Sequence, residues 1–439
     1  MNTTPPHQQV LLVSSRSDPA GSLIHEEVHA ILNEIPSLHD IYLHRQFDER
    51  LIYLDGKSLI SSASVIIFLS RHASVDSRAI LTVHVTGNFG PADYGGDKGT
   101  LTPAATVMMH AIINRLAADP PAGYEVSYEA THHGPTSVPV PSMFVEVGST
   151  ETQWYDRTAA AAVARAVVGA GAGDVIRLAG FGGTHYAKRQ TEIALTTRGG
   201  FGHIMPSRDL IHLNKKMFAD IISGSDAEAV YIDKKSISKK DISLIEGFAQ
   251  EWGIPVVSQS DLIQVKNIPF PEYLQVVRLA QSCFPGAVVD THGLTDAGDP
   301  ALVSVQKDLI TIAAKEDPRA LKAGLDLMPV ARISGGGVAF CPTFITNRKV
   351  LSKISDDLIH LCVSIIKSRC DCRFEGDCLI ITGQKFDTEK ARVLGVPAGP
   401  AYGRLMAGEV VEVLNSVITP AMVMSTTEKW ICIPGWGMK

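Results

Sequence analysis

Short apolar runs alternate with longer amphipathic stretches over the first 262 residues of this chain. The apolar runs predict buried strands, at 10–13, 65–69, 79–85, 124–128, 143–147, 175–179, 229–232 and 255–257. Apolar residues spaced three or four apart predict the helices between them, at about 23–32, 103–118, 156–168, 192–197, 214–222 and 237–252. Strands that alternate with helices at this rate favour an α/β fold, with a mixed, largely parallel sheet flanked by helices.

The pattern changes after residue 262. Helical stretches at 303–323 and 355–368 and a strand at 377–382 no longer alternate regularly. A chain of 439 residues is also too long for one hydrophobic core. We therefore expect two domains, a core at 1–262 and a second, C-terminal α+β region at 263–439.

Composition is that of an ordinary globular protein, with 45% hydrophobic and 20% charged residues. The net charge of −6 does not indicate an overall positive electrostatic potential that would attract nucleic acid. Lysine pairs such as Lys215-Lys216 could still contact phosphates locally. The alanine-rich run at 159–173 is too short and too polar to span a bilayer. We expect no membrane contact.

All seven cysteines lie at or after Cys283, so the first 282 residues offer no thiol nucleophile. This odd, uneven set and the polar first nine residues predict a reducing, cytoplasmic location without a secretory signal. Cys370 and Cys372, with Cys362 and Cys378 nearby, could form a second metal site. Their spacing does not fit a zinc knuckle, and we expect buried or free thiols.

One loop concentrates reactive side chains, Glu129-Ala-Thr-His-His-Gly-Pro135. It joins a carboxylate and a hydroxyl to His132 and His133, and imidazole is a common zinc ligand. The alternative is an exposed turn whose histidines have no function. Other reactive residues that converge on the loop would favour a functional site.

Other histidines occupy similar positions in the predicted core. His72, His84, His185 and Glu146 lie at or just past strand ends, and His203 lies in a glycine-rich loop of its own. In open α/β sheets the ligand crevice lies beyond the carboxyl ends of strands. These side chains therefore predict a metal or proton-transfer site at one rim.

Several catalytic templates are absent. The run Gly180-Phe-Gly-Gly-Thr-His185 lacks the third glycine of a dinucleotide fingerprint, and there is no phosphate loop, His-Glu-x-x-His helix or Gly-x-Ser-x-Gly elbow. A hydrolytic nucleophile in this core would be a water on a histidine-held metal. The amides of Gly182 and Gly183 could receive an anion.

Four motifs occur in one order, and together they resemble the archaeal and plant type of D-aminoacyl-tRNA deacylase over residues 8–262. They are His84-Val-Thr-Gly-Asn88, Glu129-Ala-Thr-His-His-Gly-Pro135, Phe144-Val-Glu-Val-Gly-Ser149 and Gly182-Gly-Thr-His-Tyr186. The resemblance implies a hydrolase that cleaves the ester joining a D-amino acid to the terminal ribose of tRNA. It also implies a zinc requirement and a role in keeping D-residues out of translation.

The residues supply a compatible hypothesis with one or two Zn²⁺ ions. The candidate metal ligands are His84, His132, His133, Glu146, His185 and His203. The candidate catalytic residues are Glu129 or Glu146 as base, Thr131, and Gly182 and Gly183, whose amides would stabilise the oxyanion. The candidate substrate contacts are Arg71, His72, Thr86, Asn88, Thr184, Tyr186 and Lys188. A zinc-bound water would attack the ester carbonyl.

In the C-terminal region, residues 394–405, followed by Gly408-Glu409, resemble a Gly-Pro-x-x-Gly-x-Leu element of zinc phosphodiesterases that process tRNA 3′ ends. The metal motif of those enzymes is absent, so no phosphodiesterase activity is carried over. The element is expected to be either a structural β-turn or a tRNA contact.

The expected partner is a D-aminoacyl-tRNA, with no protein partner and a monomer or small homo-oligomer. Two alternatives stay open. One is a metal-dependent hydrolase of another ester or amide, such as peptidyl-tRNA or a small acylated metabolite. The other is a non-catalytic protein that binds zinc or tRNA.

Overall fold

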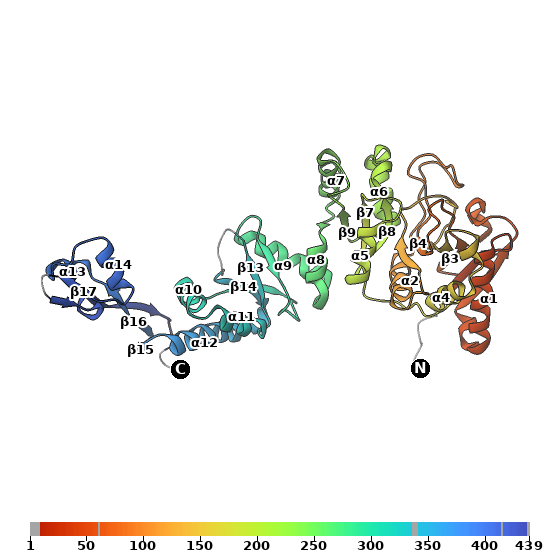
Figure 1. Cartoon of the computed structure of the whole chain (residues 1–439). Coiled ribbons are helices and arrows are strands. Elements are labelled where there is room, and N and C mark those ends of the chain that lie inside the picture. The colour runs from red at the N-terminus through yellow and green to blue at the C-terminus, as the bar shows by residue number, and fades with distance from the viewer. Residues whose placement is uncertain (1–8, 60–61, 336–340, 414–415, 437–439) are drawn as a thin grey trace, which may run out of the picture. The chain divides into compact units, whose positions relative to one another are not determined.

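The computed structural model describes residues 9–59, 62–335, 341–413 and 416–436 and divides the chain into two units, Met1–Lys266 and Asn267–Lys439 (Figure 1). Most of the polar N-terminal stretch therefore lies outside the described residues. No helix in the described ranges is long and apolar enough to cross a membrane. The expected fold class is confirmed: the first unit is α/β with mixed, mainly parallel sheets, and the second contains antiparallel sheets.

A six-stranded sheet, in the order β2-β1-β3-β6-β4-β5, dominates the first unit. Its strands are β1 (Val10–Ser15), β2 (Tyr42–Phe47), β3 (Val65–Arg71), β4 (Ile80–His84), β5 (Glu125–Tyr128) and β6 (Ser142–Gly148). The pairs β1–β2, β1–β3 and β3–β6 are parallel, whereas β4 and β5 are parallel to each other but β4 is antiparallel to β6. The edge strand β2 was not expected.

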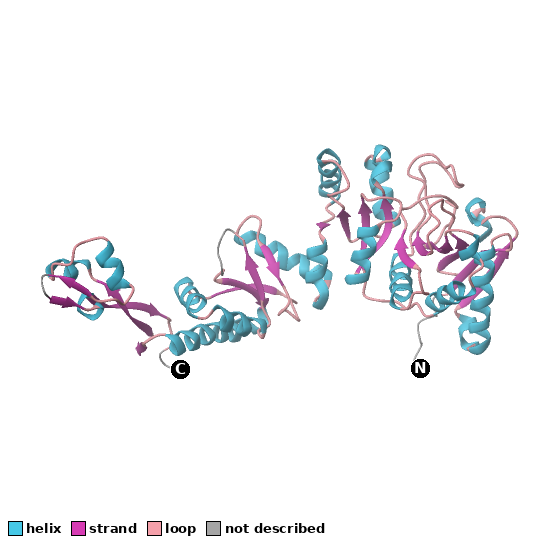
Figure 2. Cartoon of the chain, viewed as in Figure 1, coloured by secondary structure: helices cyan, strands magenta, loops and turns pink. Residues whose placement is uncertain are grey.

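Helices cover one face of this sheet, and loops cover the other (Figures 1 and 2). The helices are α1 (Pro19–Glu34), α2 (Thr106–Ala118) and α4 (Arg157–Val168), with the short α3 (Glu151–Trp154) before α4. The Asp18 carboxylate caps α1 by accepting from Gly21 N. On the other face, Leu51 and Leu54 from short 3₁₀ turns pack over Phe68 and Phe144.

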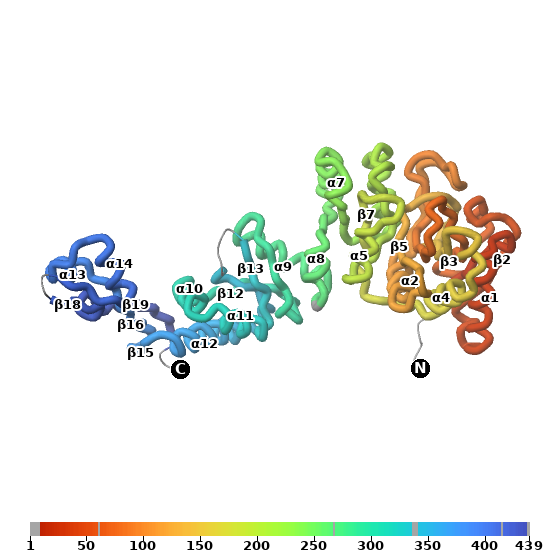
Figure 3. The backbone as a smooth tube through the Cα atoms, in the orientation of Figure 1, coloured from red at the N-terminus to blue at the C-terminus, as the bar shows by residue number. Residues whose placement is uncertain are grey.

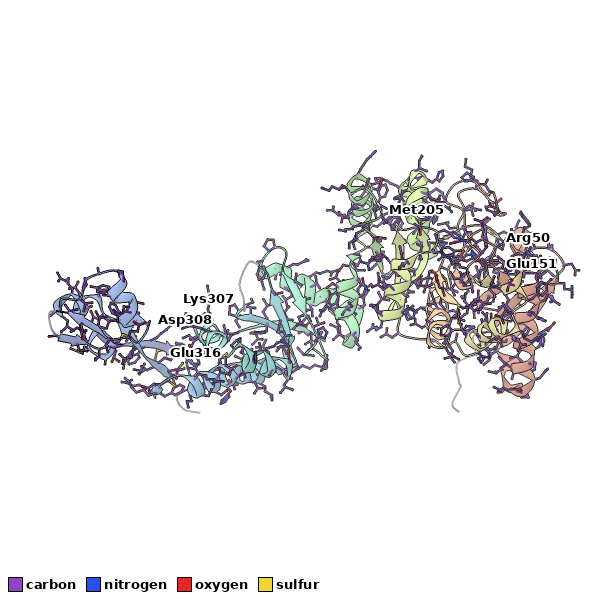
Figure 4. The ribbon with its side chains drawn as sticks, in the orientation of Figure 1. Arg50, Glu151, Met205, Lys307, Asp308 and Glu316 are labelled. Atoms are coloured by element: carbon purple, nitrogen blue, oxygen red, sulfur yellow. A yellow bond between two sulfur atoms is a disulfide. The ribbon has the colours of Figure 1, made fainter. Side chains whose placement is uncertain are left out.

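A second, parallel sheet in the order β10-β9-β7-β8 completes the unit. Its elements are β7 (Ile176–Phe181), α5 (Lys188–Thr196), β8 (Gly199–Met205), α6 (Lys215–Gly224), β9 (Ala229–Ile232), α7 (Lys239–Trp252), β10 (Val256–Val257) and α8 (Gln259–Gln264). Met205, labelled in Figure 4, ends β8. Helix α2 contacts both β4 and β8 and so joins the two sheets.

Strand β8 had been expected to be a glycine-rich loop, and that expectation is wrong. Its glycines reflect close packing: a Cβ on Gly200 would lie 2.6 Å from Val175 Cγ1, and one on Gly202 would lie 2.6 Å from Ser225 Cβ. Glycine weakens strand propensity but permits such close approach. His203 therefore lies within a buried strand.

The second unit is built from antiparallel sheets in the orders β11-β13-β14-β12, β15-β16-β19 and β17-β18. Its strands are β11 (Val288–Asp290), β12 (Pro300–Ser304), β13 (Ala331–Ser334), β14 (Thr343–Asn347), β15 (Cys372–Glu375), β16 (Cys378–Phe386), β17 (Val411–Val413), β18 (Ser416–Ile418) and β19 (Met424–Cys432). Its helices are α9 (Phe270–Cys283), α10 (Lys307–Glu316), α11 (Pro318–Asp326), α12 (Leu351–Arg369), α13 (Thr388–Val393) and α14 (Pro400–Met406). Lys307 and Glu316 mark the two ends of α10 in Figure 4.

Two local expectations for this unit are corrected. Cys378 is not a free thiol, because it faces Cys432 across the β16–β19 pair and forms a disulfide with it. The Gly-Pro element is not a β-turn: Gly399, with a φ of 104°, precedes a helix that begins at Pro400. Proline is favoured at the first helical position because its missing N–H would have no helical partner there.

Candidate active site

The histidines and carboxylates of the first unit gather on the loop-covered face of the six-stranded sheet. His84 on β4 pairs in register with Phe144 on β6, and Thr82 pairs with Glu146. Directly paired and alternate residues share a face, so His84 and Glu146 both project beside the Phe144 ring. Most of the predicted histidines and carboxylates do converge, but not at one carboxyl-end rim of the sheet, because β4 runs antiparallel to β6.

Two buried carboxylates are shared among four imidazoles. Glu129 Oε1 lies 3.0 Å from His72 Nδ1, while its Oε2 lies 3.1 Å from His185 Nε2 and 3.4 Å from His132 Nε2. Glu146 Oε2 lies 3.5 Å from His72 Nδ1 and 3.8 Å from His84 Nε2. We call these six residues, with His133, the carboxylate–histidine cluster.

His72 supplies a positive charge beside the two carboxylates of this cluster. Burial lowers the pKa of His72, but Glu129 and Glu146 outweigh it and raise that pKa to about 11. The same contacts overcome the effect of burial on the two carboxylates, holding the Glu129 pKa well below its usual value and that of Glu146 at about 2. Because of these lowered pKa values, both carboxylates are ionised at neutral pH. The Nε2 atom of His72 lies 2.9 Å from the Tyr186 hydroxyl.

Three imidazoles present their Nε2 atoms for coordination. Their Nδ1 atoms lie within hydrogen-bond distance of backbone carbonyls: 3.2 Å for His84 to Val85 O, 2.8 Å for His132 to Ala130 O and 2.6 Å for His133 to Gly134 O. A proton on Nδ1 leaves the lone pair on Nε2. One ring nitrogen from each histidine falls within 4.8 Å of the others, and His84 Nε2 makes no hydrogen bond to a described residue.

The surroundings of the adjacent residues His132 and His133 favour the neutral form of both rings. Burial, then the neighbouring imidazoles, lower the pKa of His132 well below its usual value, and burial with His84 lowers that of His133 to about 4. His84 differs, because Glu146 outweighs burial and raises its pKa. His133 also holds a left-handed backbone conformation, with a φ of 52°. Such strain persists only where the surroundings fix the backbone.

His203 is not part of this arrangement, in contrast to the prediction that it is a metal ligand. Its Nε2 lies 2.8 Å from Thr102 O and its Nδ1 lies 3.1 Å from Thr131 Oγ1, so both ring nitrogens are engaged. The Thr131 hydroxyl also accepts from Ile204 N. His203 and Thr131 therefore fasten the reactive loop to β8, and the structure assigns no chemical step to either.

The proposed oxyanion donors are also occupied. Gly182 N donates to Met205 O at 2.8 Å, and Gly183 N donates to Ser236 Oγ at 2.7 Å. Both glycines have positive φ, 94° and 90°. Their role is to turn the chain toward His185, so the prediction that these amides stabilise an oxyanion is wrong.

The predicted substrate contacts separate into three groups. Asn88 lines a cavity of about 280 Å³ beside His132 and His133. His72 and Tyr186 belong to or adjoin the carboxylate–histidine cluster. The remaining four lie elsewhere: Arg71 stacks on Trp154, Thr86 bonds Thr102, Thr184 donates to Tyr186 O, and Lys188 begins α5.

The cavity adds residues that the sequence did not single out. Tyr94 and Asp93 from the loop at 88–100, and Arg208 with Asp209 after β8, contribute to its wall. The glycine-rich composition of the first loop was a signal for Tyr94. Arg208 had none, because only the fold brings the start of its 3₁₀ turn to His133.

Comparisons with known proteins point to one family. A family model described as D-aminoacyl-tRNA deacylase matches residues 59–257. A D-aminoacyl-tRNA deacylase of Methanospirillum hungatei is 52% identical, over 98% of this chain and 99% of that protein. One from Methanoculleus marisnigri is 40% identical, over 97% and 99% of the two chains.

A crystal structure titled as a conserved protein of unknown function is also similar. It is 33% identical, with a TM-score of 0.54, and the match covers 58% of this chain and 97% of that one. The relatives above match nearly the whole chain, both units included. The chain belongs to the D-aminoacyl-tRNA deacylase family.

Proposed function

We propose that the protein hydrolyses the ester between a D-amino acid and the 3′-terminal ribose of tRNA. The observation that carries this proposal is the carboxylate–histidine cluster beside an open cavity, in a chain of this family. Two ionised carboxylates and several imidazoles in a buried site can move protons, as ester hydrolysis requires.

We further propose that His84, His132 and His133 hold one Zn²⁺ ion. Their Nδ1 contacts orient three Nε2 atoms toward one another, and three imidazoles form a donor set that suits zinc with one position left open. When bound, zinc would supply a Lewis acid that polarises a carbonyl and acidifies water.

Glu129 is the proposed general base. Its side chain is fully buried, and its Oε2 lies between His132 and His185, on the side nearer the cavity. This oxygen would accept the proton of the attacking water. His72, held protonated at Nδ1, would keep the second carboxylate oxygen neutralised and so fix the orientation of Glu129.

His185 is the proposed proton donor to the leaving ribose oxygen. Its side chain is 30% exposed, compared with 5% for His72, so it is accessible to a substrate. Glu129 Oε2 would hold the proton taken from the water, and His185, whose Nε2 lies 3.1 Å from that oxygen, would in its protonated form give its Nδ1 proton to the leaving ribose oxygen. This places base and acid in direct contact.

The cavity of about 280 Å³ would receive the aminoacyl end of the tRNA. This volume is close to the lower limit for small-molecule sites. Tyr94 offers an aromatic wall, and the exposed Arg208 guanidinium offers a cation for a backbone phosphate.

The test compares D-tyrosyl-tRNA with L-tyrosyl-tRNA, each with and without a chelator. We expect selective loss of the D-ester and abolition of that loss by the chelator. Equal hydrolysis of both esters would indicate a general esterase, and binding of tRNA without hydrolysis would indicate a non-catalytic protein. Activity that survives complete metal removal would contradict the zinc assignment alone.

A further inference from the structure

A second group of three histidines lies on the helix-covered face of the six-stranded sheet. His25 and His29 are four residues apart on α1 and therefore share one side of that helix. His44 lies on the edge strand β2, in register with Leu12 of β1. Figure 3 shows α1 and β2 side by side at the end of the sheet. We call these residues the histidine trio.

The trio and the carboxylate–histidine cluster lie on opposite faces of the sheet. Leu11 and Leu43 pack with Phe144 on the loop-covered face. Their chain neighbours, Leu12 and His44, must project to the other face because side chains alternate along a strand. The two histidine groups are therefore separated by the thickness of the sheet.

The three rings are close enough to share one ion. Their centroids lie 4.5 Å apart for His25–His29, 4.3 Å for His29–His44 and 5.3 Å for His25–His44. One ring nitrogen of each lies within 4.8 Å of the others. Nitrogens bound to one tetrahedral zinc at the usual bond length would be about 3.4 Å apart, which small side-chain rotations would reach.

Three of the trio's ring nitrogens are free of hydrogen bonds within the described residues. His25 Nδ1 and both nitrogens of His44 are buried and make no hydrogen bond to the residues that the structure describes. Burial and the neighbouring imidazoles also lower the pKa values of His25 and His44, the latter to about 4, so their lone pairs are free at neutral pH. Buried polar atoms in native proteins are normally satisfied.

We propose that His25, His29 and His44 form a second transition-metal site, which ties α1 to the edge strand β2. Three imidazoles suit zinc, nickel or copper, and the partly exposed rings leave a coordination position for water. An ion that binds the folded chain stabilises it by linkage. The site is independent of the proposed function.

The test uses the full-length protein stripped of metal and titrated with Zn²⁺, with bound metal counted by elemental analysis. We expect wild-type protein to retain one more equivalent than His29→Gln, and His39→Gln to match the wild type. His29 is half-buried and His39 is exposed, so neither change disturbs the core. Deacylase activity should be equal in all three proteins.

A second measurement isolates the trio from the active site. In the His132→Ala protein, added Zn²⁺ should still raise the melting temperature by several degrees. That rise should disappear when His44→Phe is added to His132→Ala. Equal zinc content in wild type and a folded His29→Gln protein, or an unchanged rise in the double variant, would overturn the proposal. A water that bridges the three rings, with no metal ion bound, would give either of these results.

Discussion

The two faces of one six-stranded sheet hold two histidine groups of opposite character. The loop-covered face carries imidazoles interleaved with Glu129 and Glu146, whereas the helix-covered face carries the histidine trio with no carboxylate in the group. Glu129 and Glu146 raise the pKa of His72 to about 11, whereas burial and its neighbouring imidazoles lower that of His44 to about 4.

This contrast shows what the carboxylates contribute. Buried imidazoles alone become neutral and can only donate lone pairs, which suits an ion. Imidazoles beside buried carboxylates hold and exchange protons, as hydrolysis requires. Both groups place imidazole nitrogens close enough together to hold a metal ion. The ability to move protons belongs to the carboxylate–histidine cluster.

The largest expected effect comes from removing the Glu129 carboxylate on the loop-covered face. Glu129→Gln keeps the side-chain volume but removes the proposed base, so we expect kcat for D-tyrosyl-tRNA to fall about a thousandfold. His44→Phe, on the other face, should leave kcat within about twofold. If both variants lost activity equally, the difference in function between the faces would be refuted.

The loops that cover the face bearing the carboxylate–histidine cluster should be the next most sensitive feature. A Cβ on Gly134 would lie 2.5 Å from Gly96 N and Ile52 O, so Gly134→Ala must displace the backbone beside His133. We expect a loss of about 2–3 kcal/mol in unfolding free energy, together with reduced activity. Gly171→Ala is the matched control, because nothing lies within 4 Å of its Cβ. Denaturant unfolding measures both variants, and equal stabilities would contradict the packing argument.

In metal-free protein, the contributions of His44 in the histidine trio and His72 in the carboxylate–histidine cluster to folding stability should change with pH in opposite directions. The folded pKa of His44, about 4, is below the unfolded value of 6.5, so its contribution is full above pH 6.5 and lost as pH falls toward 4. The folded pKa of His72, about 11, is above 6.5, so its contribution is full below pH 6.5 and lost as pH rises through 11.

The measurement is unfolding free energy against pH. His44→Phe should flatten the acid slope between pH 6.5 and 4, and His72→Gln should flatten the alkaline slope. Matching slopes in a variant and the wild type would show that folding does not displace the pKa of that residue.

The smallest effect should come from replacing an unpartnered imidazole by an apolar ring. In metal-free protein at pH 8, His44→Phe should change the unfolding free energy by less than about 1 kcal/mol, because no hydrogen bond is lost. His84→Phe should destabilise more, because Glu146 loses one of its two imidazole neighbours. Thermal melts would compare the two. A large loss from His44→Phe without metal would show that the trio has a structural role of its own.

Local pattern was sufficient for most of the core. The apolar runs that became β1, β3 and β6 and the amphipathic stretches that became α1 and α4 follow from periodicity, because burial of one face dominates local propensity. Strand β8 was missed since three of its seven residues are glycine, a choice that tertiary contacts with Val175 and Ser225 explain. Strand β2 was missed because its exposed edge weakens the pattern.

For the site, the sequence by itself determined which side chains could do chemistry: the loop with His132 and His133, and the carboxylates Glu129 and Glu146. Tertiary structure decided their roles. It gave acceptors to the amides of Gly182 and Gly183 and engaged both ring nitrogens of His203. It also placed His72, a predicted substrate contact, between the two carboxylates. It also brought together the histidine trio, which no motif marked. Residue type fixes what a group can donate or accept, but its partners and burial depend on strand direction and packing, which no local pattern encodes.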